Sequence, residues 1–172
     1  MPTKRPRVGI VMGSDSDLEV LRETITVLDA IGIPHEVVVA SAHRAPGRAR
    51  RYAASAERRG IRVLIAGAGG AAALPGFLAS LSPLPVIGVP INSTPLNGLD
   101  SLLSIAQMPK GVPVATVAVG KWGAANAGIL AAQILALSDA RVRRRLAAFR
   151  KAMAAEVAQR SRRVASQLKR RQ

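Results

Sequence analysis

The sequence predicts an α/β protein: a three-layer α-β-α sandwich with a parallel, flavodoxin-like sheet and a long C-terminal helix. Short apolar runs alternate with helical stretches along the chain. These runs are continuously apolar rather than alternating over most of their length, as expected of parallel strands that are covered on both faces. The 172 residues fit one domain, and 49% of them are apolar, which is ample for a core.

The expected elements follow one another in regular order. Strands are expected at 8–12, which reads as buried, and at 35–40, 62–66, 85–89 and 112–117. Two helices are expected to end near residues 31 and 59. A third is expected to follow a glycine turn at 67–70, and a fourth to span about 122–137. Within a single domain of 1–172, we expect a flexible N-terminus at 1–6, a main body at 7–138 and a basic helix at 139–172.

The formal charge of +15 is concentrated at the two ends of the chain. Residues 141–172 contain twelve lysines and arginines against one acid, whereas 8–140 contain ten basic and nine acidic residues. A basic helix attracts polyanions, but a charged helix face is commonly just solvated. Only four residues are aromatic, too few to form a stacking platform for bases. We therefore do not expect a nucleic-acid partner.

Long uncharged stretches predict self-association. Residues 63–99 carry no charge, and 111–138 carry only Lys121. Five prolines interrupt the first stretch, which excludes a membrane span of roughly 20 continuous apolar residues. More apolar surface remains than one small domain can bury, which favours a homo-oligomer. An apolar stripe along the last helix, at 142, 146, 149, 153, 157, 164 and 168, is expected to pack on its own body or, preferably, on a neighbouring subunit.

Several kinds of chemistry are excluded by composition. The absence of cysteine rules out disulfides and thiolate catalysis. His35 and His43 are eight residues apart and make no recognisable zinc pattern. The N-terminus runs directly into the first strand pattern without a secretory signal, and we expect a soluble cytoplasmic protein.

Ligands of a doubly wound sheet bind at the carboxyl ends of the strands, where three loops are expected here. In the first, 13–17, Gly13 permits a tight turn, and the hydroxyls of Ser14 and Ser16 face the start of a helix, where a phosphate binds well. The same residues fit an ordinary helix cap, since Ser14 and Asp17 have the spacing of a capping box.

The second loop, 41–46, places a hydroxyl, an imidazole and a guanidinium together. Arg44 can bind a phosphate in a bidentate manner, beside Ser41. His43 can exchange a proton near neutral pH, and it is the one imidazole in the three loops. His35 lies at the start of a strand, on the wrong side of the sheet, and is expected to be structural.

The third loop, 67–76, is rich in glycine and alanine. Gly67, Gly69 and Ala72 superficially fit the dinucleotide fingerprint, but the loop follows the third strand and has no acid about 20 residues later, so we reject that interpretation. A wall without charge suits a small, dry pocket in which backbone groups approach the substrate. Its candidate substrate-binding residues are Gly69, Gly70, Ala71, Ala73 and Leu74.

Taken together, the loops resemble the class I PurE family, the N5-carboxyaminoimidazole ribonucleotide mutases of purine biosynthesis. The likeness covers about residues 7–138. It rests on the motifs MGSDSD at 12–17, SAHRAP at 41–46, AGAGGAA at 66–72 with LPG at 74–76, LPVIGVP at 84–90, DSLLSIAQMP at 100–109 and GAANA at 123–127.

The resemblance implies an isomerase that moves a carboxylate from the exocyclic nitrogen of an aminoimidazole ribonucleotide to ring carbon C4, by decarboxylation and recarboxylation. Family members are octamers of three-layer subunits, use neither cofactor nor metal, and have their active sites at subunit interfaces. The roles implied are proton transfer for His43, phosphate binding for Arg44, Ser14, Ser16 and Ser41, and contact with the ribose hydroxyls for Asp17.

One position departs from the family pattern. The third loop normally reads Ala-Ala-His-Leu-Pro-Gly, and Ala73 stands here in place of the histidine. That imidazole is expected to help hold the carboxylate of the substrate, so its absence predicts weak activity. Three alternatives to the mutase remain: a carboxylase that makes the same product from free CO2, a non-catalytic nucleotide-binding relative, and a nucleic-acid-binding protein that uses the basic tail.

Overall fold

The structure, a computed structural model, describes residues 5–169. Residues 1–4, which make up most of the predicted flexible N-terminus, and residues 170–172, at the end of the predicted basic helix, lie outside the described residues.

Five parallel strands form one sheet, in the order β2-β1-β3-β4-β5. The strands are β1 (Val8–Met12), β2 (His35–Val39), β3 (Val63–Gly69), β4 (Val86–Ile91) and β5 (Ala115–Thr116). Every residue of β1 and β4 is buried. This burial explains why β1 and β4 read as continuous apolar runs, whereas the edge strands β2 and β5 contain no buried residue. The predicted parallel, flavodoxin-like sheet is confirmed.

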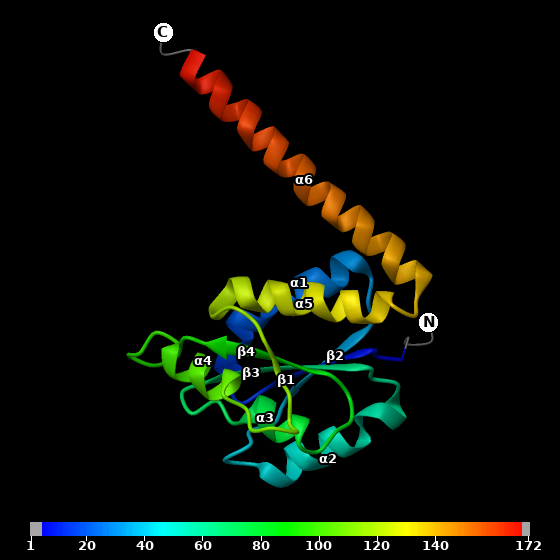
Figure 1. Cartoon of the computed structure of the whole chain (residues 1–172), viewed down its shortest axis with the longest axis vertical. Helices are drawn as coiled ribbons and strands as arrows, with labels where there is room; N and C mark the ends of the chain where they lie inside the picture. Colours follow the sequence, from blue (N-terminus) through cyan, green and yellow to red (C-terminus); the bar gives the residue numbers. More distant parts are fainter. Residues whose placement is uncertain (1–4, 170–172) are drawn as a thin grey trace.

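Helices cover both faces of the sheet and make the three predicted layers (Figure 1). One face carries α1 (Leu18–Ile31) and α5 (Gly120–Ala136), and the other carries α2 (Pro46–Ala56), α3 (Leu74–Ala79) and α4 (Leu99–Ala106). The sheet therefore divides the core in two, with Ile10 and Ile65 on the α1–α5 side and Val11 and Leu64 on the other.

The structure corrects three details of the sequence prediction. β3 continues to Gly69, so glycines expected to form a turn belong to the strand. A Cβ atom at Gly67 would lie only 2.8 Å from Leu21 of α1, so the absence of a side chain at this position lets the helix pack closely on the strand.

β5 is much shorter than predicted, because Pro113 has no N–H to donate to a strand ladder. The sequence pattern does not predict α4, which packs so closely on β4 that a Cβ at Gly88 would overlap the side chain of Ile105.

Small residues let α1 and α5 approach closely. A Cβ atom at Gly128 of α5 would lie 3.0 Å from the side chain of Val27 in α1. At this contact the hydroxyl of Thr24, which is fully buried, donates a hydrogen bond of 2.7 Å to the carbonyl of Ala124. This bond satisfies a polar pair inside an otherwise apolar layer.

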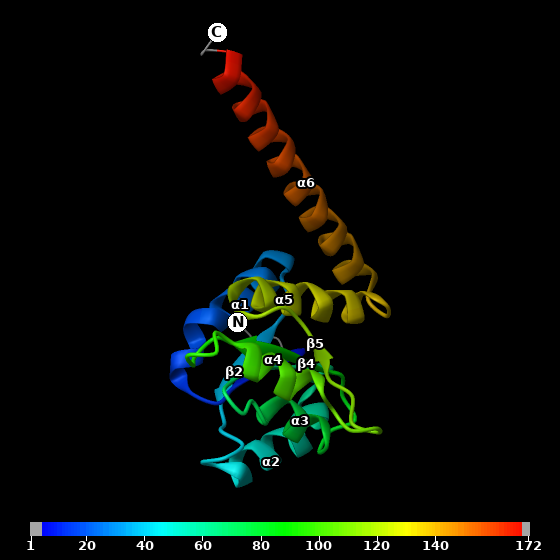
Figure 2. The ribbon, with the colours of Figure 1, turned by 60° about the vertical axis from the view of Figure 1, so that its left-hand side comes forward.

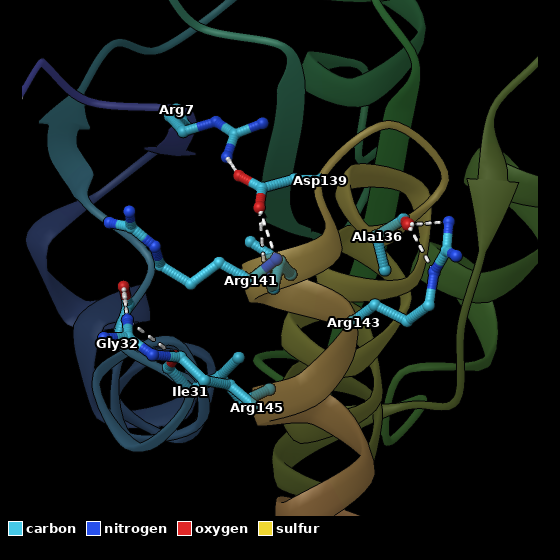
Figure 3. Close-up of polar contacts among 9 residues, drawn as sticks. Arg7, Ile31, Gly32, Ala136, Asp139, Arg141, Arg143 and Arg145 are labelled. Carbon is cyan, nitrogen blue, oxygen red and sulfur yellow. Dashed lines mark hydrogen bonds and ion pairs between the residues drawn. The ribbon is translucent and has the colours of Figure 1, made fainter.

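The long helix α6 (Ala140–Lys169) is capped where it begins. The carboxylate of Asp139 accepts hydrogen bonds from the backbone N–H groups of Arg141 (2.8 Å) and Val142 (3.1 Å), and it pairs with the guanidinium of Arg7 (Figure 3). The bond from Val142, followed by that from Arg7, lowers the pKa of Asp139 below its ordinary value. The residue that precedes β1 and the start of α6 are thereby joined.

The rest of α6 divides into a packed base and a projecting arm. Val142 and Leu146 are buried against α1 and α5, and Arg145 donates a hydrogen bond of 3.0 Å to the carbonyl of Gly32 (Figure 3). From residue 150 to 168 every side chain is exposed, and the helix points away from the body (Figures 1 and 2). The first part of the predicted apolar stripe thus packs on the body of its own chain. Among the helices of residues 5–169, none is long and apolar enough to cross a membrane.

Replacing Thr24 with valine should destabilise the chain by about 0.5–1.5 kcal/mol, because the buried hydrogen bond from its hydroxyl to the carbonyl of Ala124 is lost. Thr26→Val is the matched control, since Thr26 is exposed on the same helix, and it should change stability by less than about 0.5 kcal/mol. Urea unfolding followed by circular dichroism measures both values. Equal losses in the two variants would contradict the role assigned to the Thr24 hydroxyl.

Candidate active site at the carboxyl edge of the sheet

A cavity of about 310 Å³ lies at the carboxyl ends of the strands. The chain leaves β1 towards β2 on one side and returns to β3 on the other, and this reversal opens a crevice between the loops after the strands. Nine of the eleven predicted site residues line the cavity: Ser14, Ser16, Asp17, Ser41, His43, Arg44, Gly69, Ala73 and Leu74. Gly70 and Ala71 belong to the third loop but do not line the cavity.

The first loop forms the predicted capping box. The backbone N–H of Ser14 donates to the carboxylate of Asp17 (3.0 Å), and the Ser14 hydroxyl accepts a bond from the N–H of Ser16 (3.4 Å). The cap leads through a short 3₁₀ turn into α1. The Ser14 and Ser16 hydroxyls also bond to each other (2.9 Å) and line the cavity, so capping and ligand binding are compatible here.

Asp17 is a buried acid at the edge of the cavity. Asp17 is only 7% exposed, and this burial raises the pKa of its carboxyl above the ordinary value. The N–H groups of Ser14 and Gly13 and the positive charge of Arg44 oppose the rise without cancelling it. A carboxylate held in this way can accept hydrogen bonds from a ligand's hydroxyl groups.

The second loop connects with the first through Arg44. The guanidinium of Arg44 donates to the carbonyl of Gly13 (3.1 Å), while its backbone N–H donates to the hydroxyl of Ser41 (3.1 Å). Arg44 and His43 both remain exposed, although they line the cavity. A cation, three hydroxyls and an imidazole therefore face one space, a combination suited to binding a phosphate and moving a proton.

The third loop contributes a wall with no polar side chain. Gly70 and Ala72 both have positive φ angles, 59° and 38°, and the N–H of Ala72 donates to the carbonyl of Gly69 (3.1 Å) to close the turn. α3 then begins at Leu74, and Ala73, its N-cap, makes no side-chain hydrogen bond. Ala73 thus presents a methyl group to the cavity where a polar residue could stand.

Sequence reasoning missed a fourth loop, at 92–98, between β4 and α4. Ser93 from this loop lines the cavity, and it also lines an adjoining cavity of about 520 Å³ with Asn92, Lys121 and Trp122. The two cavities share Ser16, Asp17 and Ser93. The rule that ligands bind after parallel strands would have identified Ser93, had the fourth strand been extended to Ile91.

Comparisons with known proteins agree with one another. The family model described as AIR carboxylase matches residues 7–156. The chain belongs to the AIR carboxylase family. The N5-carboxyaminoimidazole ribonucleotide mutase of Pyrococcus horikoshii is 54% identical over 164 residues, or 95% of this chain and 92% of that protein. The Bacillus subtilis protein of the same name is 57% identical over 142 residues, or 83% and 88%. The crystal structure of Treponema denticola PurE has a TM-score of 0.81 at 28% identity, over 90% of this chain and 96% of that one.

The resemblance to class I PurE proteins is therefore confirmed. The AIR carboxylase match includes all four loops around the cavity and ends inside α6, so the arm beyond residue 156 lies outside it.

His35 lies at the amino end of β2, away from the cavity, with its ring nitrogen 3.0 Å from the carbonyl of Ile33. Within residues 5–169, no cluster of three histidine or acidic side chains could hold a metal ion.

Replacing Asp17 with asparagine should change how stability depends on pH. Because folding raises the pKa of Asp17, the folded chain binds this proton more readily than the unfolded chain. The parent should therefore gain stability relative to Asp17→Asn as the pH falls through the raised pKa, and should lose it as the pH rises again. Urea unfolding at a series of pH values measures the difference, with the exposed Asp15→Asn as control. A parent that loses stability relative to Asp17→Asn on acidification would contradict the raised pKa.

Proposed function

We propose that this chain converts N5-carboxyaminoimidazole ribonucleotide into 4-carboxy-5-aminoimidazole ribonucleotide, as an isomerase of de novo purine biosynthesis. The observation that carries the proposal is the identity of 54–57% to curated mutases over most of both chains. The cavity supports it, because it joins a cationic, hydroxyl-rich part to an uncharged wall. A ribonucleotide has the same division between its phosphate and its imidazole.

The phosphate would bind at the first two loops. Arg44 supplies a guanidinium for bidentate contact, and Ser14, Ser16 and Ser41 supply hydroxyls. Asp17 follows these residues in the cavity wall and would accept hydrogen bonds from the ribose hydroxyls. The imidazole ring would then face His43 and the glycine-rich third loop.

In the proposed reaction the bond between the exocyclic nitrogen and the carboxyl carbon breaks, which releases CO2 and leaves an electron pair that takes a proton. Ring carbon C4 attacks the CO2, and His43 removes the C4 proton so that the ring regains aromaticity. One proton is gained and one is lost, so the isomerisation balances without a co-substrate. The wall of small residues would keep the CO2 close to C4 and limit water.

Assembly and location are also part of the proposal. We infer a homo-oligomer, an octamer by the resemblance, that acts in the cytoplasm on a phosphorylated intermediate. Large apolar side chains of the single chain are strongly exposed, with Trp122 at 85%, Leu96 at 61% and Leu99 at 55%. Trp122 lines the cavity that adjoins the site, so a neighbouring subunit placed there would also shield the substrate from water.

A carboxylase that uses free CO2 is the second candidate, and the description of the matched family as AIR carboxylase favours it. Both reactions attach a carboxyl group to C4, and they differ in the source of that group. The curated relatives that are 54% and 57% identical to this chain are named mutases, and we therefore prefer the mutase reaction.

The replacement Ala73→His should raise kcat/KM for the mutase reaction about 10- to 100-fold, the value of one hydrogen bond to a charged group. Ala73 lines the cavity, so a new imidazole there would reach the substrate. Ser80→His, at the exposed end of α3, is the matched control and should leave the rate unchanged.

Absorbance of the two carboxylated nucleotides measures turnover of the parent and of each variant. His43→Asn should lower kcat about 10²- to 10⁴-fold in either background, because the proton acceptor is lost. An Ala73→His variant no faster than the parent would contradict the role given to position 73. Turnover that survives His43→Asn would reassign the proton transfer.

A further inference from the structure

The loop between β4 and α4 is held in one shape by its own hydrogen bonds. The hydroxyl of Ser101, which is fully buried, lies 3.0 Å from the carbonyls of both Ile91 and Gly98, at the two ends of the loop. The hydroxyl of Thr94 donates to the carboxylate of Asp100 (2.6 Å). These contacts give Ser93, between Ile91 and Thr94, a defined place beside the cavity.

The third loop is shaped to receive Ser93. A Cβ atom at Gly69 would lie 3.1 Å from the Cβ of Ser93 and would overlap its hydroxyl oxygen. The hydroxymethyl group of Ser93 therefore occupies the space that a side chain at position 69 would fill. Thr94 makes the corresponding contact with the next glycine, since a Cβ at Gly70 would lie 3.7 Å from its methyl group.

Ser93 stands beside a wall that is otherwise without hydrogen-bonding side chains. The cavity residues that the third loop and the end of β3 contribute are glycine, alanine and leucine, namely Ala68, Gly69, Ala72, Ala73 and Leu74. The cation, the acid and the imidazole of the cavity all come from the first two loops. A charged group of a ligand that faces this wall loses water and needs a hydrogen-bond partner.

We propose that the Ser93 hydroxyl binds the carboxylate of the substrate beside the glycine-rich wall, and so makes the site selective for carboxylated aminoimidazole ribonucleotides. This rests on the proposed function, in which the phosphate binds at the first two loops and the carboxylate moves beside the third. Ala73 offers that carboxylate only a methyl group, and Ser93 supplies a hydroxyl beside the same wall.

Binding of two ribonucleotides that differ only in the carboxylate tests the assignment. Isothermal titration measures the Kd of 4-carboxy-5-aminoimidazole ribonucleotide and of 5-aminoimidazole ribonucleotide for the full chain and for Ser93→Ala. Ser93→Ala should weaken the carboxylated nucleotide about 10-fold or more, as expected for a hydrogen bond to a charged group. The nucleotide without the carboxylate should change by less than about 2-fold, because it makes no such bond.

Ser104→Ala is the matched control. Ser104 is an exposed serine of α4 whose hydroxyl donates to the carbonyl of Asp100, and it lines neither cavity, so its replacement should leave both affinities unchanged. Equal weakening of both nucleotides by Ser93→Ala, or no weakening of either, would overturn the role of Ser93. A parent chain that binds neither nucleotide would instead refute the proposed function, and the role of Ser93 would fall with it.

Discussion

The parallel pairing of β1 with β2 on one side and β3 on the other is the constraint on which the rest of the site depends. Met12 pairs with Val39 in one ladder and with Gly67 in the other, so all three strands deliver their following loops to the same edge of the sheet. Residues that are distant in sequence, such as Ser14, His43 and Ala73, therefore meet around one cavity. The buried packing of helices on both faces holds that register, because a slip by one residue would turn each side chain of the strand to the opposite face, where it would no longer fit the packed helices.

Much of this arrangement could be predicted from the sequence, because it depends on local patterns. Continuous apolar runs identify buried parallel strands, and the rule for their carboxyl ends identifies the loops. The spacing of Ser14 and Asp17 predicts a capping box, which the structure contains. His35 and His43 could be separated by their positions at opposite ends of β2. Each of these inferences needs only the order of residues within one element.

The remaining features depend on contacts between elements, which the sequence does not display. In the sequence Gly67 reads as a turn residue, but in the structure it lies within β3, and Leu21 of α1 packs against it. Ser93 becomes a site residue because Gly69 leaves room for it, and Asp17 acquires a raised pKa through burial. The arm of α6, from residue 150 onward, continues the apolar stripe of the packed base, yet its side chains up to residue 168 are exposed.

The source of the transferred carboxyl group is the most direct test of the central claim. N5-carboxyaminoimidazole ribonucleotide labelled with ¹³C in its carboxylate would be converted by the full chain in buffer that contains unlabelled bicarbonate. Our account predicts that the product keeps the label at its C4 carboxylate, because the released CO2 stays beside the ring in the cavity until C4 attacks it. A product that carries unlabelled carbon, with a rate that rises with bicarbonate, would contradict the mutase and identify a carboxylase.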